Sequence, residues 1–321
     1  MSGSAVLVTG AGGYLGAQVV AALAAGQAPA GRIVAADVRA VPPEGQLAGV
    51  EYVQADVRSP ALREVFARCR PAVVVHLASI VTPGKHSTRE LEYAVDVGGT
   101  ENVLQACLAT GVRRIVVSSS GAAYGYHADN PARIDEDQPL RGNESFAYAW
   151  HKRLVEEMLA RWRTRHPGLE QVVFRIGTIL GERVHNQITA LFEQARPLAI
   201  RGAASPFVFI WDQDVVGCIV QALSSAQNGI FNVAGDGALT MHEIAARQGK
   251  RCRVMPAWAL QGALALLKPI GLTPYGPEQV DFLRYRPVLS NARLKQQFGY
   301  VPRKTSAEVF EFWLAARRQA H

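Results

Sequence analysis

The sequence predicts an α/β fold, in which a doubly wound parallel sheet is followed by a smaller, irregular C-terminal lobe. Short apolar runs alternate with helix-length segments through the first half, and a glycine-rich turn follows the first run. After Gly177 the alternation loosens and prolines recur. With 321 residues, of which 49% are hydrophobic and 19% charged, the chain can bury a large core, which excludes wholesale disorder.

The apolar runs define the expected elements in chain order. Most runs are continuous rather than alternating, as in strands that are buried on both faces of a parallel sheet. The helical segments between them predict right-handed crossovers that cover both faces. Strands are expected at residues 5–9, 32–36, 50–53, 72–77, 112–118 and 171–176, and helices at 14–25, 60–70, 88–110 and 146–165.

The division into domains follows the same pattern. Residues 1–176 are expected to form the sheet domain, and residues 207–227 resemble a strand, turn and helix that return to it. Residues 177–206 and 228–321 are left for the smaller lobe. The prolines of that part favour an irregular lobe over another regular layer.

Charge is distributed unevenly between the two halves. Residues 1–150 hold 12 basic and 14 acidic side chains, a balance of −2, whereas residues 151–321 hold 22 and 13, a balance of +9. An anionic partner would therefore be drawn to the second half. Arg183, Arg201, Arg284 and Arg286 are candidates for contacting it, although a solvated surface explains any single arginine as well.

Several classes of partner are excluded. The four cysteines lie far apart, without a CxxC pattern or a histidine pair at metal spacing, so we expect no metal site and no disulfide framework. The N-terminus lacks the basic segment of a signal peptide, and the longest apolar stretch, 258–272, is interrupted by Lys268 and Pro269. No nucleic-acid module is recognisable. We expect a cytoplasmic protein that binds a small molecule rather than a membrane or nucleic acid.

Gly10, Gly13 and Gly16 form a GxxGxxG turn between the first strand and the first helix. In a Rossmann fold such a turn lets the backbone approach a pyrophosphate, while the helix N-terminus supplies N–H groups and partial positive charge. Asp37 follows the second strand, roughly 20 residues downstream, where a carboxylate binds ribose hydroxyls and repels a 2′-phosphate. The pattern predicts NAD rather than NADP, with nearby Arg39 as the residue that would favour a phosphate.

Tyr148 and Lys152 lie four residues apart in a helical stretch, so both side chains are on one face. A neighbouring ammonium stabilises the phenolate and lowers the pKa of a tyrosine from about 10, so that it can accept a proton from a substrate hydroxyl. Upstream, the serines at 118–120 lie at the C-terminal end of a strand, where open parallel sheets bind their ligands. A serine hydroxyl there can hold the substrate oxygen.

In this order, the motifs resemble the extended short-chain dehydrogenase/reductase family, specifically its NAD-dependent epimerase/dehydratase group. Asp56-Val57, HLAS at 76–79, GTENVLQAC at 99–107 and DQDVV at 212–216 extend the resemblance over nearly the whole chain. The resemblance implies NAD as the cofactor, with substrate in the second half. It also implies a homodimer formed through the helices at 88–110 and 146–165.

The resemblance assigns individual residues by motif position. Catalytic roles are implied for Ser120, Tyr148 and Lys152. Contacts with NAD are implied for Gly10, Gly13, Tyr14, Leu15, Gly16, Asp37, Asp56, Val57, Leu77, Ala78, Ser79, Ser118, Tyr148 and Lys152. Contacts with the substrate are implied for Thr82, Ser120, Tyr148, Gly177 and Arg284.

Three departures from the family pattern bear on function. Gly121 and Ala122 stand where dehydratases carry an acidic pair, so dehydration is not expected. Gly177 replaces the Asn, and Phe-Val at 207–208 the Arg, that nucleotide-sugar members usually have. Asp96 stands where the family's VNVxGT motif has Asn.

These observations leave one leading function and two alternatives. The leading hypothesis is a sugar or nucleotide-sugar epimerase that retains its NAD. The first alternative is an NAD-dependent dehydrogenase or reductase of a steroid- or lipid-like alcohol, in which the apolar residues 258–272 and 275–283 would line a pocket. The second is a non-catalytic, NAD-binding regulatory protein, which the intact Ser-Tyr-Lys set argues against.

Overall fold

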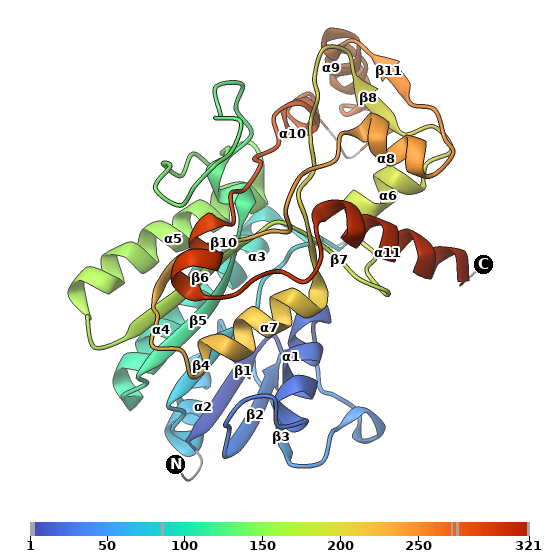
Figure 1. The fold of residues 1–321 in the computed structure, drawn as a ribbon. Helices are drawn as coiled ribbons and strands as arrows, with labels where there is room; N and C mark the ends of the chain where they lie inside the picture. The colour runs from blue at the N-terminus through green and yellow to red at the C-terminus, as the bar shows by residue number, and fades with distance from the viewer. Residues whose placement is uncertain (1–3, 85–86, 271, 274–275, 320–321) are drawn as a thin grey trace.

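A computed structural model describes residues 4–84, 87–270, 272–273 and 276–319 of the chain. Its centre is a seven-stranded, wholly parallel sheet in the order β10-β6-β5-β4-β1-β2-β3 (Figure 1). This arrangement confirms the predicted α/β Rossmann fold. The strands are β1 (Ala5–Thr9), β2 (Arg32–Asp37), β3 (Val50–Gln54), β4 (Val73–His76), β5 (Arg114–Ser120), β6 (Glu170–Ile176) and β10 (Gly229–Val233).

Helices cover both faces of this sheet because successive strand residues point to opposite sides. In β1, Val6 and Val8 belong to the core beneath α1 (Tyr14–Ala24) and α7 (Asp212–Ala222). Leu7, between them, belongs to the core on the other face. That second face is covered by α2 (Leu62–Cys69), α4 (Gly99–Thr110) and α5 (Ala147–Arg165).

The helix expected at 88–110 has a more complex structure than a regular α-helix. It consists of α3 (Arg89–Tyr93), a π-helical turn η2 (Ala94–Gly98) and α4. The Thr88 side chain caps its start by accepting a hydrogen bond from the Leu91 N–H. Periodicity alone does not distinguish a π-turn from an α-helix, and such turns are frequent at functional sites.

The second half of the chain returns to the main sheet later than expected. The strand β9 (Phe209–Trp211) pairs with β7 (Thr178–Leu180) in a separate two-stranded sheet, while Ile210 and α7 of the 207–227 segment pack on the sheet domain, α7 against α1. The strand that joins the main sheet is β10, beside β6, within the range expected for the lobe. This strand is short and begins at Gly229, directly after the polar residues Gln227 and Asn228, so it gives a weak signal.

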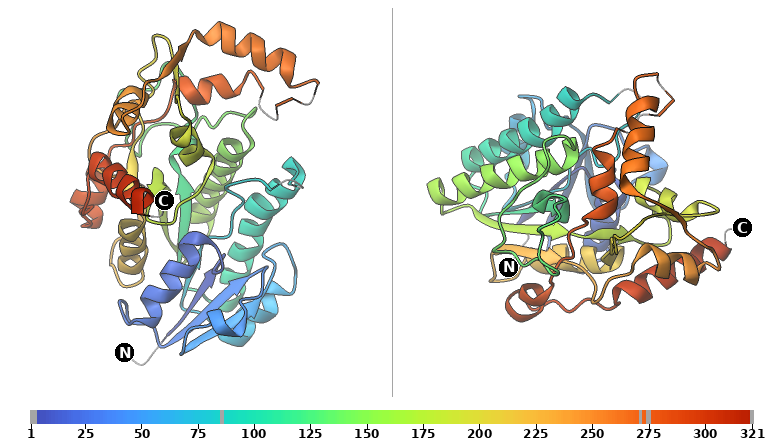
Figure 2. Two further views of the ribbon diagram at one scale, coloured as in Figure 1. Left: turned by 90° about the vertical axis from the view of Figure 1, so that its right-hand side faces the viewer. Right: turned by 90° about the horizontal axis from the view of Figure 1, so that it is seen from above.

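The remaining elements form the smaller lobe, which lies beyond the carboxyl ends of the sheet strands (Figures 1 and 2). A two-stranded sheet of β8 and β11 is accompanied by short helices, while α11 packs against β7 and β9. These elements are α6 (Gln187–Glu193), β8 (Leu198–Ile200), α8 (Met241–Arg247), β11 (Arg253–Met255), α9 (Ala257–Leu267), α10 (Gln279–Arg284) and α11 (Ser306–Gln319).

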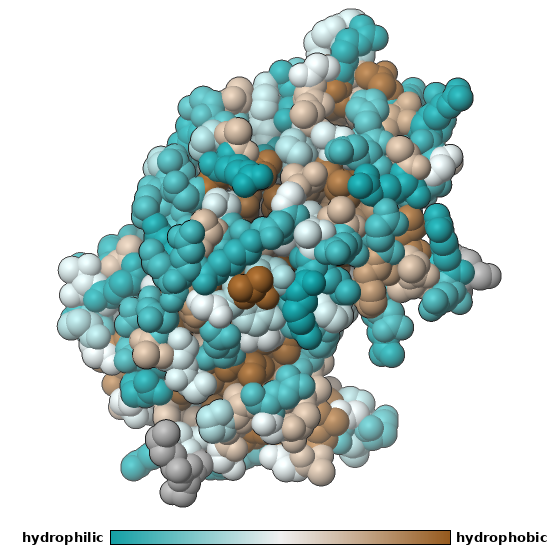
Figure 3. Space-filling model, viewed as in Figure 1, coloured by the Kyte–Doolittle hydropathy of each residue, from teal (hydrophilic) through white to brown (hydrophobic). Residues whose placement is uncertain are grey.

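The apolar helix α9 does not line an enclosed pocket. None of its residues is buried, and Trp258 is 77% and Leu266 75% exposed. Apolar residues reach the surface in the upper part of the molecule, where α9 and β11 lie (Figures 1 and 3). Tyr275, at the start of the second apolar stretch, lies outside the described residues. No helix in the described ranges is long and apolar enough to cross a membrane.

Candidate active site

The glycine turn lies between β1 and α1, and two of its glycines are required by close backbone contacts. Gly10 has φ +72°, and a Cβ there would lie 2.6 Å from the backbone N of Ala78. A Cβ at Gly16 would lie 2.1 Å from the carbonyl oxygen of Gly10. Gly13 is the N-cap of α1 and no side chain caps the helix. The N–H groups at this helix end are therefore available to an anion.

Asp37, at the end of β2, lies beside this turn. Its Oδ2 accepts a hydrogen bond from the Gly12 N–H at 2.9 Å, and its Oδ1 accepts one from the Arg39 N–H at 3.0 Å. The Arg39 guanidinium donates to the Gly12 carbonyl at 3.1 Å and lies 3.6 Å from Asp37 Oδ1. Arg39, the residue that would favour the 2′-phosphate of NADP, is thus paired with Asp37, the carboxylate expected to repel that phosphate.

Four more predicted cofactor residues occupy the surroundings of the turn. The Tyr14 hydroxyl donates to Asp212 Oδ2 at 2.5 Å, which links the start of α1 to the start of α7. Leu15 is partly buried against the core under α1. Asp56 is bound by Arg58 at 2.6 Å, which lowers the pKa of the carboxyl group, and Val57 is buried. Tyr14 thereby serves a contact between elements that the sequence did not predict.

The segment after β4 joins the glycine turn to the π-turn. His76 is buried, with Nδ1 2.7 Å from the Thr9 hydroxyl and Nε2 3.0 Å from the Thr100 hydroxyl. The Leu77 N–H donates to the Thr9 carbonyl at 3.0 Å, and Ala78 lies against Gly10. Ser79 Oγ is buried and has no hydrogen-bond partner among the described residues. Its polar neighbour is the Asp96 carboxylate, and the Ser79 side chain helps to lower the pKa of that carboxyl group.

The predicted catalytic residues meet at the carboxyl end of β5. Lys152 is buried, its Nζ donates to the Ser118 carbonyl at 3.2 Å, and the same Nζ lies 5.6 Å from the Tyr148 ring centroid. Ser118 Oγ is 3.5 Å from the His76 carbonyl. Ser120 Oγ accepts a hydrogen bond from the Ala122 N–H at 3.1 Å, so its own hydroxyl proton remains free to be donated.

The predicted substrate residues are less closely gathered. Thr82 is exposed in the loop after β4, and Gly177 lies against Val208, whose Cγ2 would be 3.2 Å from a Cβ at that position. Arg284 stacks on the Tyr285 ring at 4.5 Å. Arg286, two residues further, is placed very differently. The sequence alone does not distinguish Arg284 from Arg286, because the two arginines lie two residues apart in the same local surroundings.

The Arg286 guanidinium lies between two aromatic rings, with Cζ 3.7 Å from the Phe207 centroid and 4.0 Å from the Phe282 centroid. Its Nε and Nη2 are buried and have no hydrogen-bond partner in the part of the chain that the structure describes. Burial lowers the pKa of this group, partly offset by Tyr126. Buried guanidinium nitrogens without an acceptor are costly, and an anion beside Nε and Nη2 would offset that cost.

An aromatic wall lies between Arg286 and Tyr148, the predicted catalytic tyrosine. Phe282 stacks on Phe146 with ring centroids 5.6 Å apart, and Tyr126 meets both rings edge-on at 5.1 and 5.5 Å. Tyr148 packs against the same cluster. The segment that begins α5 and the helix α10 of the lobe therefore form one apolar surface beside the Tyr148 ring.

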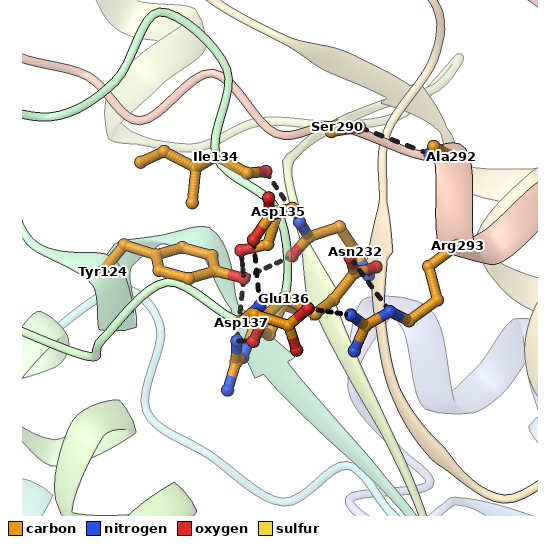
Figure 4. A network of polar contacts seen from close by, with 10 residues as sticks. Tyr124, Ile134, Asp135, Glu136, Asp137, Asn232, Ser290, Ala292 and Arg293 are labelled. Atoms are coloured by element: carbon orange, nitrogen blue, oxygen red, sulfur yellow. Dashed lines mark hydrogen bonds and ion pairs between the residues drawn. The ribbon is translucent and has the colours of Figure 1, made fainter.

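A buried polar network lies beneath the serine segment. Arg175, on β6, donates to both oxygens of Glu156 at 2.8 and 3.0 Å and to the Tyr124 hydroxyl at 2.8 Å. That hydroxyl donates to Asn232 on β10, whose backbone N–H donates to Glu136 (Figure 4). The network joins β6, β10 and the loop around Glu136. All three guanidinium nitrogens of Arg175 have an acceptor in it.

A Rossmann sheet with a glycine turn, an acidic residue ending β2 and a Tyr-Lys pair at the carboxyl edge defines the extended short-chain dehydrogenase/reductase enzymes. The model of the NAD dependent epimerase/dehydratase family matches residues 6–234. The chain belongs to this family and is an NAD-dependent enzyme. Described residues form no cluster that could hold a metal ion.

Individual relatives resemble the chain over its whole length. An uncharacterized protein of Mycobacterium tuberculosis is 25% identical over 316 residues, covering 97% of this chain and 84% of the relative. Thermus thermophilus UDP-glucose 4-epimerase, solved with NAD, has a TM-score of 0.75 and 25% identity, covering 99% of this chain and 100% of that one. Bordetella bronchiseptica WbmG, solved with NAD and UDP, has a TM-score of 0.74 and 18% identity, covering 98% and 94%.

The residues of this chain fit the cofactor of the family. The uncapped start of α1 and the near approach of Gly10 to Ala78 are features of a dinucleotide site. Asp37 stands beside the turn as a ribose ligand does.

Proposed function

We propose that this enzyme is an epimerase of a sugar or nucleotide sugar that acts at a secondary alcohol through Ser120, Tyr148 and Lys152. The observation that carries the proposal is the position of Lys152, whose Nζ is held by the Ser118 carbonyl within 5.6 Å of the Tyr148 ring centroid. The likeness to Thermus thermophilus UDP-glucose 4-epimerase and to WbmG, which was solved with UDP, supports the substrate class.

Each catalytic side chain has a defined task in this proposal. NAD, when bound, supplies the reversible hydride acceptor. The Tyr148 phenolate oxygen takes the proton of the substrate hydroxyl, and the Lys152 ammonium stabilises the phenolate before that transfer. The Ser120 hydroxyl donates a hydrogen bond to the substrate oxygen, without giving up its proton, and so stabilises the developing charge. For epimerisation, Tyr148 later returns the proton to the oxygen on the reduced carbon.

The unpartnered guanidinium of Arg286 supports an anionic substrate. Phosphate oxygens supply the acceptors that Nε and Nη2 lack, and the flanking rings of Phe207 and Phe282 hold the guanidinium plane in place. Arg286 thus takes the substrate role that the sequence gave to Arg284.

The test is the Tyr148→Phe variant, assayed with a panel of UDP-, GDP- and dTDP-sugars. We expect epimerisation to fall at least about 1000-fold, because the proton acceptor is removed, while NAD binding is retained. Wild-type turnover of none of these sugars, or undiminished turnover by Tyr148→Phe, would contradict the proposal. A Tyr126→Phe variant is the matched control, because it removes a hydroxyl from the same aromatic wall.

A second candidate function is a dehydrogenase or reductase of a lipid-like alcohol. The aromatic wall of Tyr126, Phe146 and Phe282 beside Tyr148 favours it, as does Gly177 in place of the usual Asn. An epimerase retains NAD through each turnover, whereas a dehydrogenase exchanges it. Purified protein that carries bound NAD and needs none added supports the epimerase, and a strict requirement for added NAD supports the dehydrogenase.

We further propose that the enzyme is a homodimer formed through α3, α4 and α5. Tyr93 and Leu108 support this interface, since they are 47% and 50% exposed on α3 and α4. A Leu108→Arg variant that remains as large as the wild type in sedimentation would contradict this interface.

A further inference from the structure

The helix α9 of the lobe turns an apolar side outward. Its positions 258, 262, 265 and 266 are spaced i, i+4, i+7 and i+8, which places them on one side of a helix, and all four are exposed. The only polar residue of α9, Gln261, is partly buried. A helix on the surface of a soluble domain normally turns its polar side to water, so α9 is oriented the opposite way. We call this side the α9 face, and it consists of Trp258, Gly262, Ala265 and Leu266.

Further exposed apolar side chains lie just before and after α9 in the chain. Val254 on β11 is 44% exposed, and Ile270 and Leu272, beyond the end of the helix, are 67% and 71% exposed. In the space-filling view, apolar residues reach the surface in this part of the molecule (Figure 3). Single exposed apolar residues are ordinary, whereas a group of them marks a surface that binds a partner.

The segments that carry this surface are basic and contain no acidic residue. Residues 194–211 include β8, and residues 244–277 include β11 and α9. Together these two segments hold seven basic side chains and no Asp or Glu. Of the seven, Lys268 is paired with Glu278 from outside the segments. Most of the charge excess of the second half therefore remains uncompensated here, which favours an anionic partner.

Four arginines of these segments are exposed and have no ion pair among the described residues. The backbone places them beside the start of α9. The Arg201 N–H donates to the Met255 carbonyl at 2.8 Å, directly before Pro256, which is the N-cap of α9. The strand β11, which begins at Arg253, pairs in parallel with β8. The four are Arg196, Arg201, Arg251 and Arg253.

A bilayer with anionic lipids matches both the apolar and the basic part of this surface. The 11 residues of α9 extend over about 16 Å, roughly half the hydrocarbon thickness of a bilayer, so the helix can lie along a bilayer but cannot cross it. Trp and Leu side chains enter the boundary between headgroups and acyl chains, and arginines bind the headgroups. A second copy of the chain fits less well, because a two-fold contact would bring the same uncompensated arginines together.

We propose that the α9 face and the four arginines form a docking surface for a bilayer that contains anionic lipids. The expectation that the protein binds no membrane rests on the lack of a spanning or leader segment, which does not bear on a helix that lies along the surface. The helix α9 also contacts α10, which carries Phe282 of the aromatic wall, so docking would bring lipid headgroups near that wall. The inference goes beyond the proposed function and does not depend on the reaction.

The first test is co-sedimentation of the full chain with vesicles of phosphatidylcholine, or of equal parts of phosphatidylcholine and phosphatidylglycerol. We expect the anionic vesicles to bind at least about tenfold more tightly, and added salt to weaken that binding, because the arginines are exposed. Arg251→Gln with Arg253→Gln should weaken binding to the anionic vesicles roughly 10- to 30-fold. Arg161→Gln with Arg165→Gln is the matched control, because it removes the same charge from exposed positions of α5.

The second test concerns the apolar part of the surface. Trp258→Gln with Leu266→Gln should weaken binding to the same vesicles at least about tenfold, since these side chains no longer favour the acyl boundary. Val301→Gln is the matched control, because Val301 is 65% exposed but belongs to neither α9 nor β11. Brominated lipids should quench the tryptophan fluorescence of the wild type more than that of Trp258→Phe. All of these positions are exposed, so thermal unfolding should be unchanged in every variant.

Several outcomes would overturn the proposal. One is an absence of binding to the anionic vesicles at low salt, and another is binding that neither pair of substitutions weakens. Equal quenching in the wild type and Trp258→Phe would place the lipid on another surface. In sedimentation without vesicles, a smaller mass for Trp258→Gln with Leu266→Gln than for the wild type would assign the α9 face to a second copy. None of these measurements needs a substrate, so an absence of epimerase turnover counts against the proposed function alone.

Discussion

Arg175 in the sheet domain and Arg286 in the lobe both have buried guanidinium nitrogens, but they differ in the hydrogen-bond acceptors that the described residues offer them. Arg175 is bound by Glu156, Tyr124 and the Glu136 carbonyl. Arg286 has aromatic rings on both sides, while its Nε and Nη2 have no acceptor in the described residues.

The two surroundings shift the pKa values of these arginines in opposite directions. Burial alone would lower the pKa of Arg175, but the Glu156 carboxylate outweighs it and raises that pKa. For Arg286 burial dominates and the pKa is lowered. The Arg175 charge is compensated by the Glu156 carboxylate, whereas no described carboxylate bonds to Arg286, which agrees with the proposed role of Arg286 in binding an anion.

The largest effect is expected from Arg175→Met. This variant leaves Glu156, which is 4% exposed, without its counter-charge, and breaking a buried pair from one side costs about 3–5 kcal/mol of unfolding free energy. Urea denaturation measures the loss. The double variant Arg175→Met, Glu156→Leu should recover part of it, because no lone charge remains. A loss below about 1 kcal/mol in the single variant would show that the network is not what holds this region.

In contrast to Arg175→Met, the variant Arg286→Met should weaken ligand binding and leave the unfolding free energy nearly unchanged. We expect its unfolding free energy to change by less than about 1 kcal/mol, because the apolar replacement keeps the contact with both rings. Affinity for UDP should fall roughly 10- to 100-fold, as expected when a charged hydrogen-bond donor is lost. Calorimetry with UDP measures this, and Arg284→Met is the matched control. If Arg284→Met weakens binding and Arg286→Met does not, the assignment of the two arginines is reversed.

His76 is a third buried side chain, and it differs from both arginines. Its ring nitrogens lie beside the hydroxyls of Thr9 and Thr100, yet burial keeps the imidazole neutral. Burial lowers its pKa from 6.5 to about 4, so the unfolded chain binds a proton more readily than the folded one. The contribution of the neutral His76 imidazole to the unfolding free energy is therefore fully present above pH 6.5 and is lost as the pH falls toward 4. The decline should reach about 2 kcal/mol between pH 7 and pH 5.

Urea denaturation at both pH values, in wild type and His76→Asn, measures this contribution. The variant cannot titrate, so its stability should depend less on pH over that interval by about the same amount. An equally steep decline in both proteins would place the proton uptake elsewhere in the fold.

The contrast between the two arginines also separates what the sequence predicts from what it does not. The six expected strands and the Tyr148–Lys152 spacing rest on local patterns, and the fold class is confirmed. The roles of the predicted site residues stay predictions. The structure alone distinguishes Arg286 from Arg284, because Phe207 lies far away in sequence. Asp96 and His151 likewise come together from two elements, with 3.7 Å between Oδ2 and Nδ1, and the sequence signals only the unusual residue type at 96.

The smallest effect is expected from Arg39→Gln, and it tests whether a partner matters when the charge is exposed. Arg39 is paired with Asp37 at 3.6 Å, but its side chain is 71% exposed, so water screens the pair. We expect the unfolding free energy to change by less than about 0.5 kcal/mol. NAD affinity should change less than about threefold, since Asp37 keeps its hydrogen bond from the Gly12 N–H. Fluorescence titrations with NAD and NADP measure the outcome, with Asp37→Asn as the opposite variant. A strong gain in NAD affinity would mean that Arg39 competes with the ribose for Asp37, so that a partner can block a ligand site even at the surface.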